Sequence, residues 1–275
     1  MTIKCKGSLV DLSKPVVMGI LNITQNSFYD GGQWNSIDKI LNHVEKMLSD
    51  GATFIDVGAY SSKPNAEFIS PEDELSQIVP VVKLLVQNFP NILISIDTFR
   101  ANVSEACIAQ GAAIINDISA GNLDPQMLPT IAKLQVPYVM MHMQGNPQTM
   151  QSFTQYENLT KEVIFYFSEK IAEARALGIN DIIVDPGYGF SKTLSQNYEL
   201  LQQSELLKLL ELPILIGVSR KSMIYKALDI TPDKALNGTT FLHAIALIKG
   251  ASILRVHDVK EAMEAVKLYN LLEKQ

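Results

Sequence analysis

Cysteine is scarce in this sequence, and long apolar runs are missing. The only cysteines are Cys5 and Cys107, without the CxxC spacing of a zinc or redox site, so a disulfide framework is excluded. The apolar run from Val16 to Leu21 is too short to cross a membrane and lacks the layout of a secretory signal. We therefore expect a protein of the reducing cytoplasm that does not bind membranes.

An excess of positive charge is also lacking. The formal net charge of -6 gives no general attraction to nucleic acid, so we expect no nucleic-acid partner and look for local clusters of basic groups instead. The sequence contains no Ser-His-Asp or Cys-His nucleophile set, no HExxH zinc site and no Rossmann or P-loop fingerprint in its required context. No Pro/Ser-rich linker divides the 275 residues, which favours a single domain over residues 1–275.

Short apolar runs alternate with amphipathic stretches along the whole chain, which predicts repeated βα units. One predicted helix starts at the N-cap Ser70, with Pro71 in its first turn and Asp73 completing a capping box. Another ends at Gly178, which suits a left-handed C-terminal position. The eight strand candidates are Val16 to Asn22, Phe54 to Gly58, Ile92 to Asp97, Ala113 to Asp117, Tyr138 to His142, Ile182 to Asp185, Ile214 to Val218 and Ile253 to His257.

Eight buried strands could form a closed α/β barrel of the (β/α)8 TIM type or an open doubly wound sheet, and counting does not separate them. Polar residues follow nearly every strand, and in a barrel these positions converge on one mouth, where active sites lie. We therefore expect the barrel. The residues at strand ends are Asn22, Asp56, Asp97, Asn116, Asp117, His142, Asp185, Ser219, Arg220, Lys221, Arg255 and His257.

Two carboxylates, an amide and an ammonium would meet at this mouth, from Asp97, Asn116, Asp185 and Lys221. This set suits a flat heterocycle rich in donors and acceptors, because a carboxylate can accept two parallel N–H bonds and an ammonium can donate to a ring carbonyl. The alternative is that each acid only caps the next helix or pairs with a lysine on the rim.

A second group of basic side chains comes from the last two predicted strands, where barrels often bind phosphate. It consists of Ser219, Arg220, Lys221, Arg255 and His257. These groups would hold a dianion, and Asn22 could offer a neutral oxygen to Mg2+ on its phosphates. The alternative is a solvated basic rim.

The order of the motifs resembles the dihydropteroate synthases over about Val16 to Asp258. The motifs that carry the resemblance are Met18-Gly19-Ile20-Leu21-Asn22-Ile23-Thr24, Ser27-Phe28-Tyr29-Asp30-Gly31-Gly32, Ser95-Ile96-Asp97-Thr98, Ile115-Asn116-Asp117, Met141-His142-Met143-Gln144-Gly145, Asp185-Pro186-Gly187-Tyr188-Gly189-Phe190, Ser219-Arg220-Lys221-Ser222 and Arg255-Val256-His257-Asp258. The resemblance implies a reaction of a dihydropterin pyrophosphate with 4-aminobenzoate, and homodimers.

The resemblance also implies roles for individual residues. The catalytic set would be Lys221, Arg255, His257 and Asp97. The pterin site would contain Asp97, Asn116, Asp185, Lys221, Met140, Phe190 and Gly217. The pyrophosphate would be bound by Asn22, Arg255, His257 and Lys63, with Mg2+ on Asn22. We expect a dissociative substitution, in which the bond to pyrophosphate breaks before the aniline nitrogen attacks.

The aminobenzoate site implied by the resemblance depends on two loops in which this sequence departs from the family pattern. Its residues would be Thr24, Phe28, Ser62, Lys63, Pro64, Ser219 and Arg220. The departures are Gln25 and Asn26 for the usual Pro and Asp, and Ala59, Tyr60, Ser62, Lys63 and Asn65 for the usual Gly, Glu, Thr, Arg and Gly. Lys63 keeps a positive charge without the two-pronged contact of arginine.

Two other functions fit the same pattern. A pterin-binding methyltransferase domain shares the barrel and pocket, although the basic turn at Ser219-Arg220-Lys221 favours a pyrophosphate leaving group. A paralogue with altered loops could bind pterin without catalysis, which the complete set of pocket residues opposes.

Overall fold

The structure is a computed structural model that describes residues 1–23, 33–60 and 69–273. Its centre is a sheet of eight parallel strands with the order β8-β7-β6-β5-β4-β3-β10-β9. A parallel bridge between Val184 and Ile214 joins the two ends of this order, so the sheet closes into a barrel. The strands are β3 Val16–Asn22, β4 Phe54–Gly58, β5 Ile94–Asp97, β6 Ile114–Asp117, β7 Tyr138–Met141, β8 Ile182–Asp185, β9 Leu215–Ile216 and β10 Ile253–Val256. The expected fold class is confirmed; the expected single domain stays a prediction.

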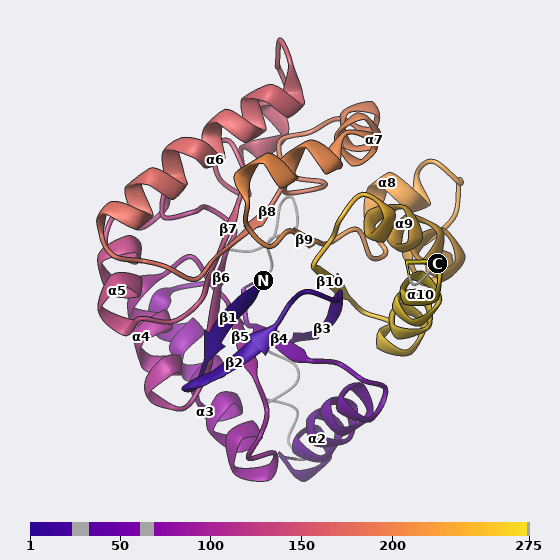
Figure 1. The fold of residues 1–275 in the computed structure, drawn as a ribbon. Coiled ribbons are helices and arrows are strands. Elements are labelled where there is room, and N and C mark those ends of the chain that lie inside the picture. Colours follow the sequence, from indigo (N-terminus) through magenta and orange to yellow (C-terminus); the bar gives the residue numbers. More distant parts are fainter. Residues whose placement is uncertain (24–32, 61–68, 274–275) are drawn as a thin grey trace.

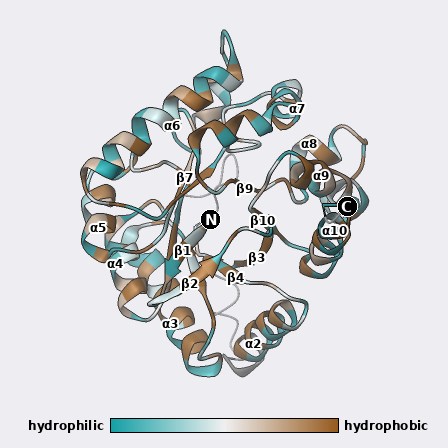
Figure 2. Cartoon of the chain, in the orientation of Figure 1, coloured by the Kyte–Doolittle hydropathy of each residue, from teal (hydrophilic) through white to brown (hydrophobic). Residues whose placement is uncertain are grey.

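Helices surround the ring of strands (Figure 1). Along helices such as α6, hydrophobic and hydrophilic residues alternate in the pattern of a helix with one buried face (Figure 2). No helix in the described part of the chain is long and apolar enough to cross a membrane. The helices are α2 Gln33–Ser49, α3 Pro71–Asn88, α4 Ala101–Ala109, α5 Met127–Leu134, α6 Leu159–Ala176, α7 Leu194–Gln202, α8 Ser222–Tyr225, α9 Leu236–Ile248 and α10 Val259–Leu272, with short 3-10 turns at Met150–Ser152, Ser204–Leu210 and Pro232–Lys234.

The two helix-end signals in the sequence are borne out, with one correction. Ser70 is the N-cap of α3, and its side chain accepts a hydrogen bond from the Asp73 backbone N–H. The predicted capping box is wrong, because the Asp73 carboxylate accepts from the Ser70 hydroxyl at 2.8 Å instead of reaching back to the Ser70 backbone. After α6, Gly178 takes the left-handed conformation with φ of 83°.

Five predicted strands are shorter than expected. Strand β5 begins at Ile94 because Ile92 closes a turn onto the Phe89 carbonyl at 3.0 Å. Strand β9 covers only Leu215–Ile216, because the chain then turns, with the Lys221 N–H donating to the Val218 carbonyl at 3.1 Å. The other shortened strands are β6, β7 and β10.

An apolar layer fills the lower half of the barrel, on the side where the strands begin. It consists of Met18, Phe54, Ile114, Val139, Ile183, Leu215 and Ile253, and the N-terminal hairpin of β1 Thr2–Cys5 and β2 Ser8–Asp11 covers it with Ile3, Cys5 and Leu12. Side chains two residues further along a strand face the same side. The next layer toward the mouth therefore contains Asp56, Asn116, Asp185 and Arg255, so the barrel's packing presents polar groups at the carboxyl ends of the strands.

Candidate active site

A buried network joins polar side chains from four strands at the mouth of the barrel. The Arg255 guanidinium donates from Nε to Asp56 Oδ2 at 2.6 Å and from Nη2 to Asp97 Oδ2 at 2.5 Å. Asn116 Nδ2 donates to the same Asp56 oxygen at 3.2 Å. Asp56 is completely buried, and 18% of the Arg255 side chain is exposed. One face of the arginine therefore remains open to solvent at the mouth.

Burial and the neighbouring charges in this network shift the pKa values of its ionisable groups. Burial raises the pKa of Asp97 to about 7, with Arg255 acting in the opposite direction and Asp56 adding to the rise. Burial alone would lower the pKa of Arg255, but the carboxylates of Asp56 and Asp97 outweigh it and raise the pKa well above its ordinary value. Arg255 therefore stays charged, and a proton that binds here binds to a carboxylate.

Asp185 and Lys221 lie on the same side of the barrel mouth. Asp185 Oδ1 accepts the Gly187 backbone N–H at 2.8 Å. The Lys221 ammonium donates to the Tyr188 carbonyl at 2.5 Å and lies 4.8 Å from the centre of the Phe190 ring. Burial lowers the pKa of Lys221 to about 8 against the attraction of Asp185, and burial raises the pKa of Asp185 against the attraction of Lys221. Each of these two groups stabilises the charge of the other.

Apolar side chains form a wall beside these charges. Phe190 belongs to a buried cluster with Ile118, Met141, Met143 and Met150. Met140, which we expected in the pterin site, belongs instead to the main core on the opposite face of β7. Side chains alternate along a strand, so Met141 faces the mouth in its place.

A glycine keeps space open between the two basic groups. A Cβ at Gly217 would lie 3.8 Å from Arg255 Cβ and 3.9 Å from Lys221 Nζ. Any larger side chain at this position would extend into the region that Arg255 and Lys221 share.

The second basic group predicted from the sequence divides into two parts. Ser219 Oγ lies 3.0 Å from His257 Nδ1 and accepts the His257 backbone N–H at 3.2 Å, so these two side chains form one unit at the rim. Arg220 instead pairs with Asp258, with both bonds at 2.8 Å, and donates to the carbonyls of Pro232 and Asp233. The guanidinium of Arg220 therefore fixes local loop structure.

The remaining predicted site residues lie at or beyond the end of β3 and β4. Asn22 is exposed at the end of β3, where it pairs in register with Gly58. Thr24, Phe28, Ser62, Lys63 and Pro64 lie outside the described residues, as do Gln25, Asn26 and Asn65.

Two side chains of the site were not selected from the sequence. Asp56 connects Arg255 with Asn116, and its position at a strand end was the same signal that selected Asp97 and Asp185. Lys192 is buried near Asp185 although it belongs to a loop. A loop lysine is usually solvated, so the sequence contains no signal for its burial.

The match to known proteins covers almost the whole chain. The family model described as "Pterin binding enzyme" matches residues 18–257. The dihydropteroate synthase of Escherichia coli is 43% identical over 98% of this chain and 95% of that protein. This chain is a member of the dihydropteroate synthase family.

Solved structures of the dihydropteroate synthase family agree with the fold. The synthase of Yersinia pestis in complex with a sulfonamide drug is 42% identical, covers all of both chains and superposes with a TM-score of 0.93. The synthase of Xanthomonas albilineans with 4-aminobenzoic acid is 34% identical, covers 100% of this chain and 98% of that chain, and has a TM-score of 0.91.

Tyr60 is one of the residues in which this chain departs from the dihydropteroate synthase pattern, and its surroundings are well defined. Its ring packs edge-on against Phe99 at 5.3 Å, and its hydroxyl accepts from Gln148 Nε2 at 3.0 Å. The buried Arg100 guanidinium lies 5.6 Å from the Tyr60 ring, pairs with Glu74, and donates to the Ile69 carbonyl at 2.5 Å. Tyr60 is therefore part of a buried cluster that holds the chain on both sides of residues 61–68.

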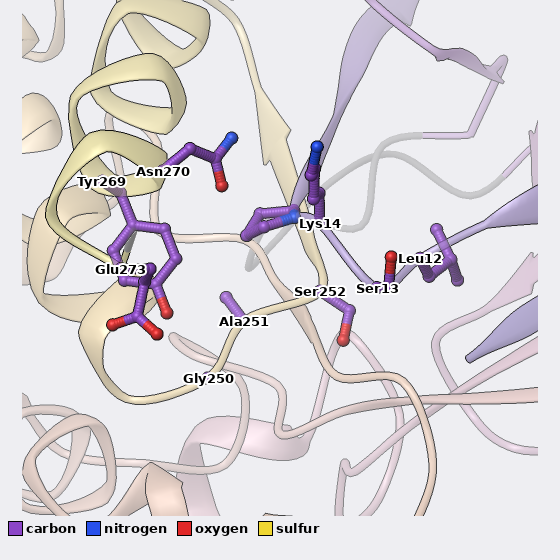
Figure 3. Close-up of a pocket in the computed structure, with 10 residues that line it drawn as sticks. Leu12, Ser13, Lys14, Gly250, Ala251, Ser252, Tyr269, Asn270 and Glu273 are labelled. Atoms are coloured by element: carbon purple, nitrogen blue, oxygen red, sulfur yellow. The ribbon is translucent and has the colours of Figure 1, made fainter. Parts of the chain in front are cut away.

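Figure 3 shows a hollow of about 260 Å³. Its lining residues place it at the end of the barrel where the strands begin, opposite the mouth. Its lining includes Lys14, Ser252, Tyr269 and Glu273, from segments that precede β3 and β10 or end α10. Active sites of these barrels lie at the carboxyl ends of the strands, so we assign the function to the mouth.

Proposed function

We propose that this protein is a dihydropteroate synthase of folate biosynthesis, which condenses 6-hydroxymethyl-7,8-dihydropterin pyrophosphate with 4-aminobenzoate to give 7,8-dihydropteroate and pyrophosphate. The observation that carries the proposal is the convergence of Asp97, Asn116, Asp185, Lys221 and Arg255 at one end of the barrel. The relatives support it, because dihydropteroate synthases match this chain over nearly the full length of both proteins.

The pterin ring is recognised by its hydrogen-bonding edges. Asp185 accepts from the 2-amino group and the adjacent ring N–H, while Lys221 donates to the ring carbonyl. Asn116 and Asp97 bind neighbouring ring atoms. The apolar wall that contains Met141 and Phe190 covers the flat face of the ring.

The pyrophosphate binds at the rim. Arg255 and His257 donate to its oxygens, and Lys63, outside the described residues, adds a further positive charge. Asn22 would hold Mg2+ at this position, because it offers a neutral amide oxygen at the exposed end of β3 and the ion's other ligands could come from water and phosphate. When bound, Mg2+ would neutralise charge on the leaving group.

The reaction is a dissociative substitution at the methylene carbon of the pterin substrate. The C–O bond to pyrophosphate breaks first, and its electron pair leaves with the pyrophosphate while the dihydropterin ring delocalises the methylene cation. Arg255 and His257 stabilise the developing charge on the departing oxygen. The aniline nitrogen then attacks the methylene carbon and loses a proton to water. No protein nucleophile is required; the site holds the two reactants in line.

The aminobenzoate site comprises Ser219, Arg220 and the two loop segments that contain Thr24, Phe28, Ser62, Lys63 and Pro64. The complex of the Xanthomonas albilineans relative with 4-aminobenzoic acid supports a site for this substrate. The sulfonamide complex of the Yersinia pestis relative supports inhibition by sulfonamides. Ser219 is held at the rim by its contact with His257.

A coupled assay tests the proposal directly. Purified enzyme is expected to release pyrophosphate and form dihydropteroate in equal amounts when both substrates and Mg2+ are present. Asn22→Ala should raise the Mg2+ concentration required for half the maximal rate. Binding of the pterin substrate without turnover would instead identify a catalytically inactive paralogue, and methyl transfer to cob(I)alamin would identify a methyltransferase.

A homodimer is proposed from an apolar surface on the outside of the barrel. A hollow of about 170 Å³ is lined by Tyr198, Ile224, Leu228, Gly238, Phe241 and Leu242. Phe241 is 64% exposed and Leu228 is 54% exposed, a degree of apolar exposure that favours coverage by a second copy. Light scattering should give the mass of a dimer, and Phe241→Glu should give a monomer; a monomeric wild-type protein would contradict the proposal.

A cytoplasmic location is proposed from the cysteines. Cys5 and Cys107 are both free and buried, which suits a reducing compartment. Fractionation of the native cells should recover the protein with cytoplasmic markers.

A further inference from the structure

Lys192 is a buried lysine whose ammonium makes three hydrogen bonds. Only 3% of the residue is exposed. Its Nζ donates to the Gly187 carbonyl at 3.0 Å and to the Phe190 carbonyl at 2.9 Å, and it lies 3.0 Å from His142 Nδ1. An ammonium has three N–H donors and no acceptor, so three acceptors satisfy it completely.

His142 supplies the third acceptor because it is fixed as a neutral ring. Burial lowers the pKa of His142 well below its ordinary value, and the charge of Lys192 adds to this effect. Tyr166 packs edge-on against the imidazole at 4.9 Å and Tyr156 lies 6.1 Å away. With Nδ1 accepting from Lys192, the imidazole proton lies on Nε2.

The two carbonyl acceptors belong to the turn that follows β8, and this turn carries the proposed pterin contacts. The turn begins at Asp185, whose carboxylate accepts the Gly187 N–H. It continues through Tyr188, whose carbonyl accepts from Lys221, and ends at Phe190, whose ring lies beside the Lys221 ammonium. Lys192 thus binds the backbone of the same turn at two points.

Other groups also bind this turn: the Gly189 N–H donates to Asn197 Oδ1 at 2.6 Å, and the Gly189 carbonyl accepts from Gln151 Nε2 at 3.2 Å. Lys192 is the side chain that binds the carbonyls of both Gly187 and Phe190. Gly187 has a φ of 70°, and a Cβ there would lie 2.2 Å from the His142 carbonyl oxygen, so the turn approaches the end of β7 backbone to backbone. Burial raises the pKa of Asp185; Lys221 is the main charge that opposes this rise, and Lys192 adds a smaller contribution. Burial also lowers the pKa of Lys192 to about 7, against the attraction of Asp185. The main effect of Lys192 on Asp185 is therefore on its position, through the turn.

We propose that Lys192 is a positioning residue for pterin binding, which holds the turn of residues 185–190 through Gly187 and Phe190 so that Asp185 and Lys221 face the pterin ring. This inference rests on the proposed function. If Lys192 only stabilised the fold, its replacement would lower the stability of the protein and would weaken the binding of both substrates to the same extent.

The test measures the two substrates separately in the full-length enzyme. Lys192→Met keeps the length of the side chain and removes its donors and charge. Because this substitution leaves the carbonyls of Gly187 and Phe190 without their donor, we expect Kd for 6-hydroxymethylpterin, measured by calorimetry, to rise about tenfold. The KM for 4-aminobenzoate should change less than about twofold, since the turn contacts the pterin only.

Leu85→Ala is the matched stability control, because Leu85 is fully buried in α3, a helix that packs against α4 and β4. This variant should lower the melting temperature while leaving Kd for the pterin probe unchanged. His142→Leu is the second variant; it removes one acceptor and leaves both turn bonds, so Kd for the probe should rise only about two- to threefold.

The outcomes separate the inference from the proposed function. A wild-type enzyme that forms no dihydropteroate contradicts the proposed function. If the wild type is active and Lys192→Met binds 6-hydroxymethylpterin as tightly as the wild type, or weakens both substrates equally, the positioning role is wrong. If Lys192→Met does not fold, unchanged probe binding by His142→Leu overturns the role, and the expected small loss supports it.

Discussion

Replacement of Asp56 by asparagine tests the central network of the site. Asp56 Oδ2 accepts from both Arg255 Nε at 2.6 Å and Asn116 Nδ2 at 3.2 Å. One carboxylate oxygen therefore aligns Arg255, which we propose binds the pyrophosphate, with Asn116, which we propose binds the pterin. Asparagine has nearly the same shape, and its carbonyl oxygen can take the position of Oδ2 and accept both bonds, but it has no charge to pair with Arg255. The substitution therefore changes the electrostatics of the network with little change of volume.

The expected magnitude follows from the contacts that remain. Removing one partner of a buried ion pair costs about 3–5 kcal/mol when the other charge is left alone. Arg255 retains its bond to Asp97 at 2.5 Å and has one exposed face, so we expect a smaller effect, near the roughly 1.5–3 kcal/mol of a hydrogen bond to a charged group. About 2 kcal/mol corresponds to roughly a 30-fold fall in kcat/KM for the pterin substrate.

The assay is steady-state release of pyrophosphate, with each substrate varied in turn. Ser95→Ala is the matched control, because Ser95 lies opposite Asp56 on β5 and its buried hydroxyl has no hydrogen-bond partner in the described part of the chain. This control should retain the wild-type rate. The reasoning is refuted if Asp56→Asn stays within about threefold of the wild type, or if Ser95→Ala loses activity to the same extent, because the network would then not govern turnover.

Three further predictions concern single positions. Because the pKa of Lys221 is about 8, binding of the pterin substrate should weaken as the pH rises through 8, and Lys221→Arg should move this loss to higher pH; a pH profile of kcat/KM with an unshifted alkaline limb would contradict it. Gly217→Leu should abolish binding of 6-hydroxymethylpterin by filling the space beside Arg255, whereas Gly217→Ala should retain it, as measured by calorimetry. Arg100→Met should lower the free energy of unfolding by about 3–5 kcal/mol, because it leaves the buried Glu74 carboxylate without its ion-pair partner. If urea unfolding shows that the loss of free energy is less than about 1 kcal/mol, this ion pair does not stabilise the fold.

Much of the fold could be predicted because its signals are local. Each strand is a short apolar run and each helix repeats apolar residues with the helical period, so all eight barrel strands were found from the sequence. The strands that lie fully in the barrel wall, such as Val16–Asn22 and Ile182–Asp185, also had the predicted limits. At β9 the apolar run continues to Val218, but the strand already ends before Gly217. Composition does not show that a loop begins within an apolar run.

The site was predicted less completely, and two methionines illustrate why. Met140 and Met141 are adjacent, apolar and equally plausible in the sequence, but a strand sends neighbouring side chains to opposite faces. Only the paired strand decides which one faces the mouth, and the structure puts Met141 with Phe190. An error of one residue along the strand therefore exchanged a side chain that faces the mouth for one that belongs to the core.

What the sequence by itself determined is the set of chemical groups at the strand ends and their order along the chain. Tertiary structure alone decided which of them bind one another: Asp56 and Arg255 are 199 residues apart and meet only because β3 pairs with both β10 and β4. Lys192 becomes buried for the same reason, since the loops after β7 and β8 pack together at the mouth. Local patterns specify elements, whereas burial and charge pairing depend on the closure of the barrel.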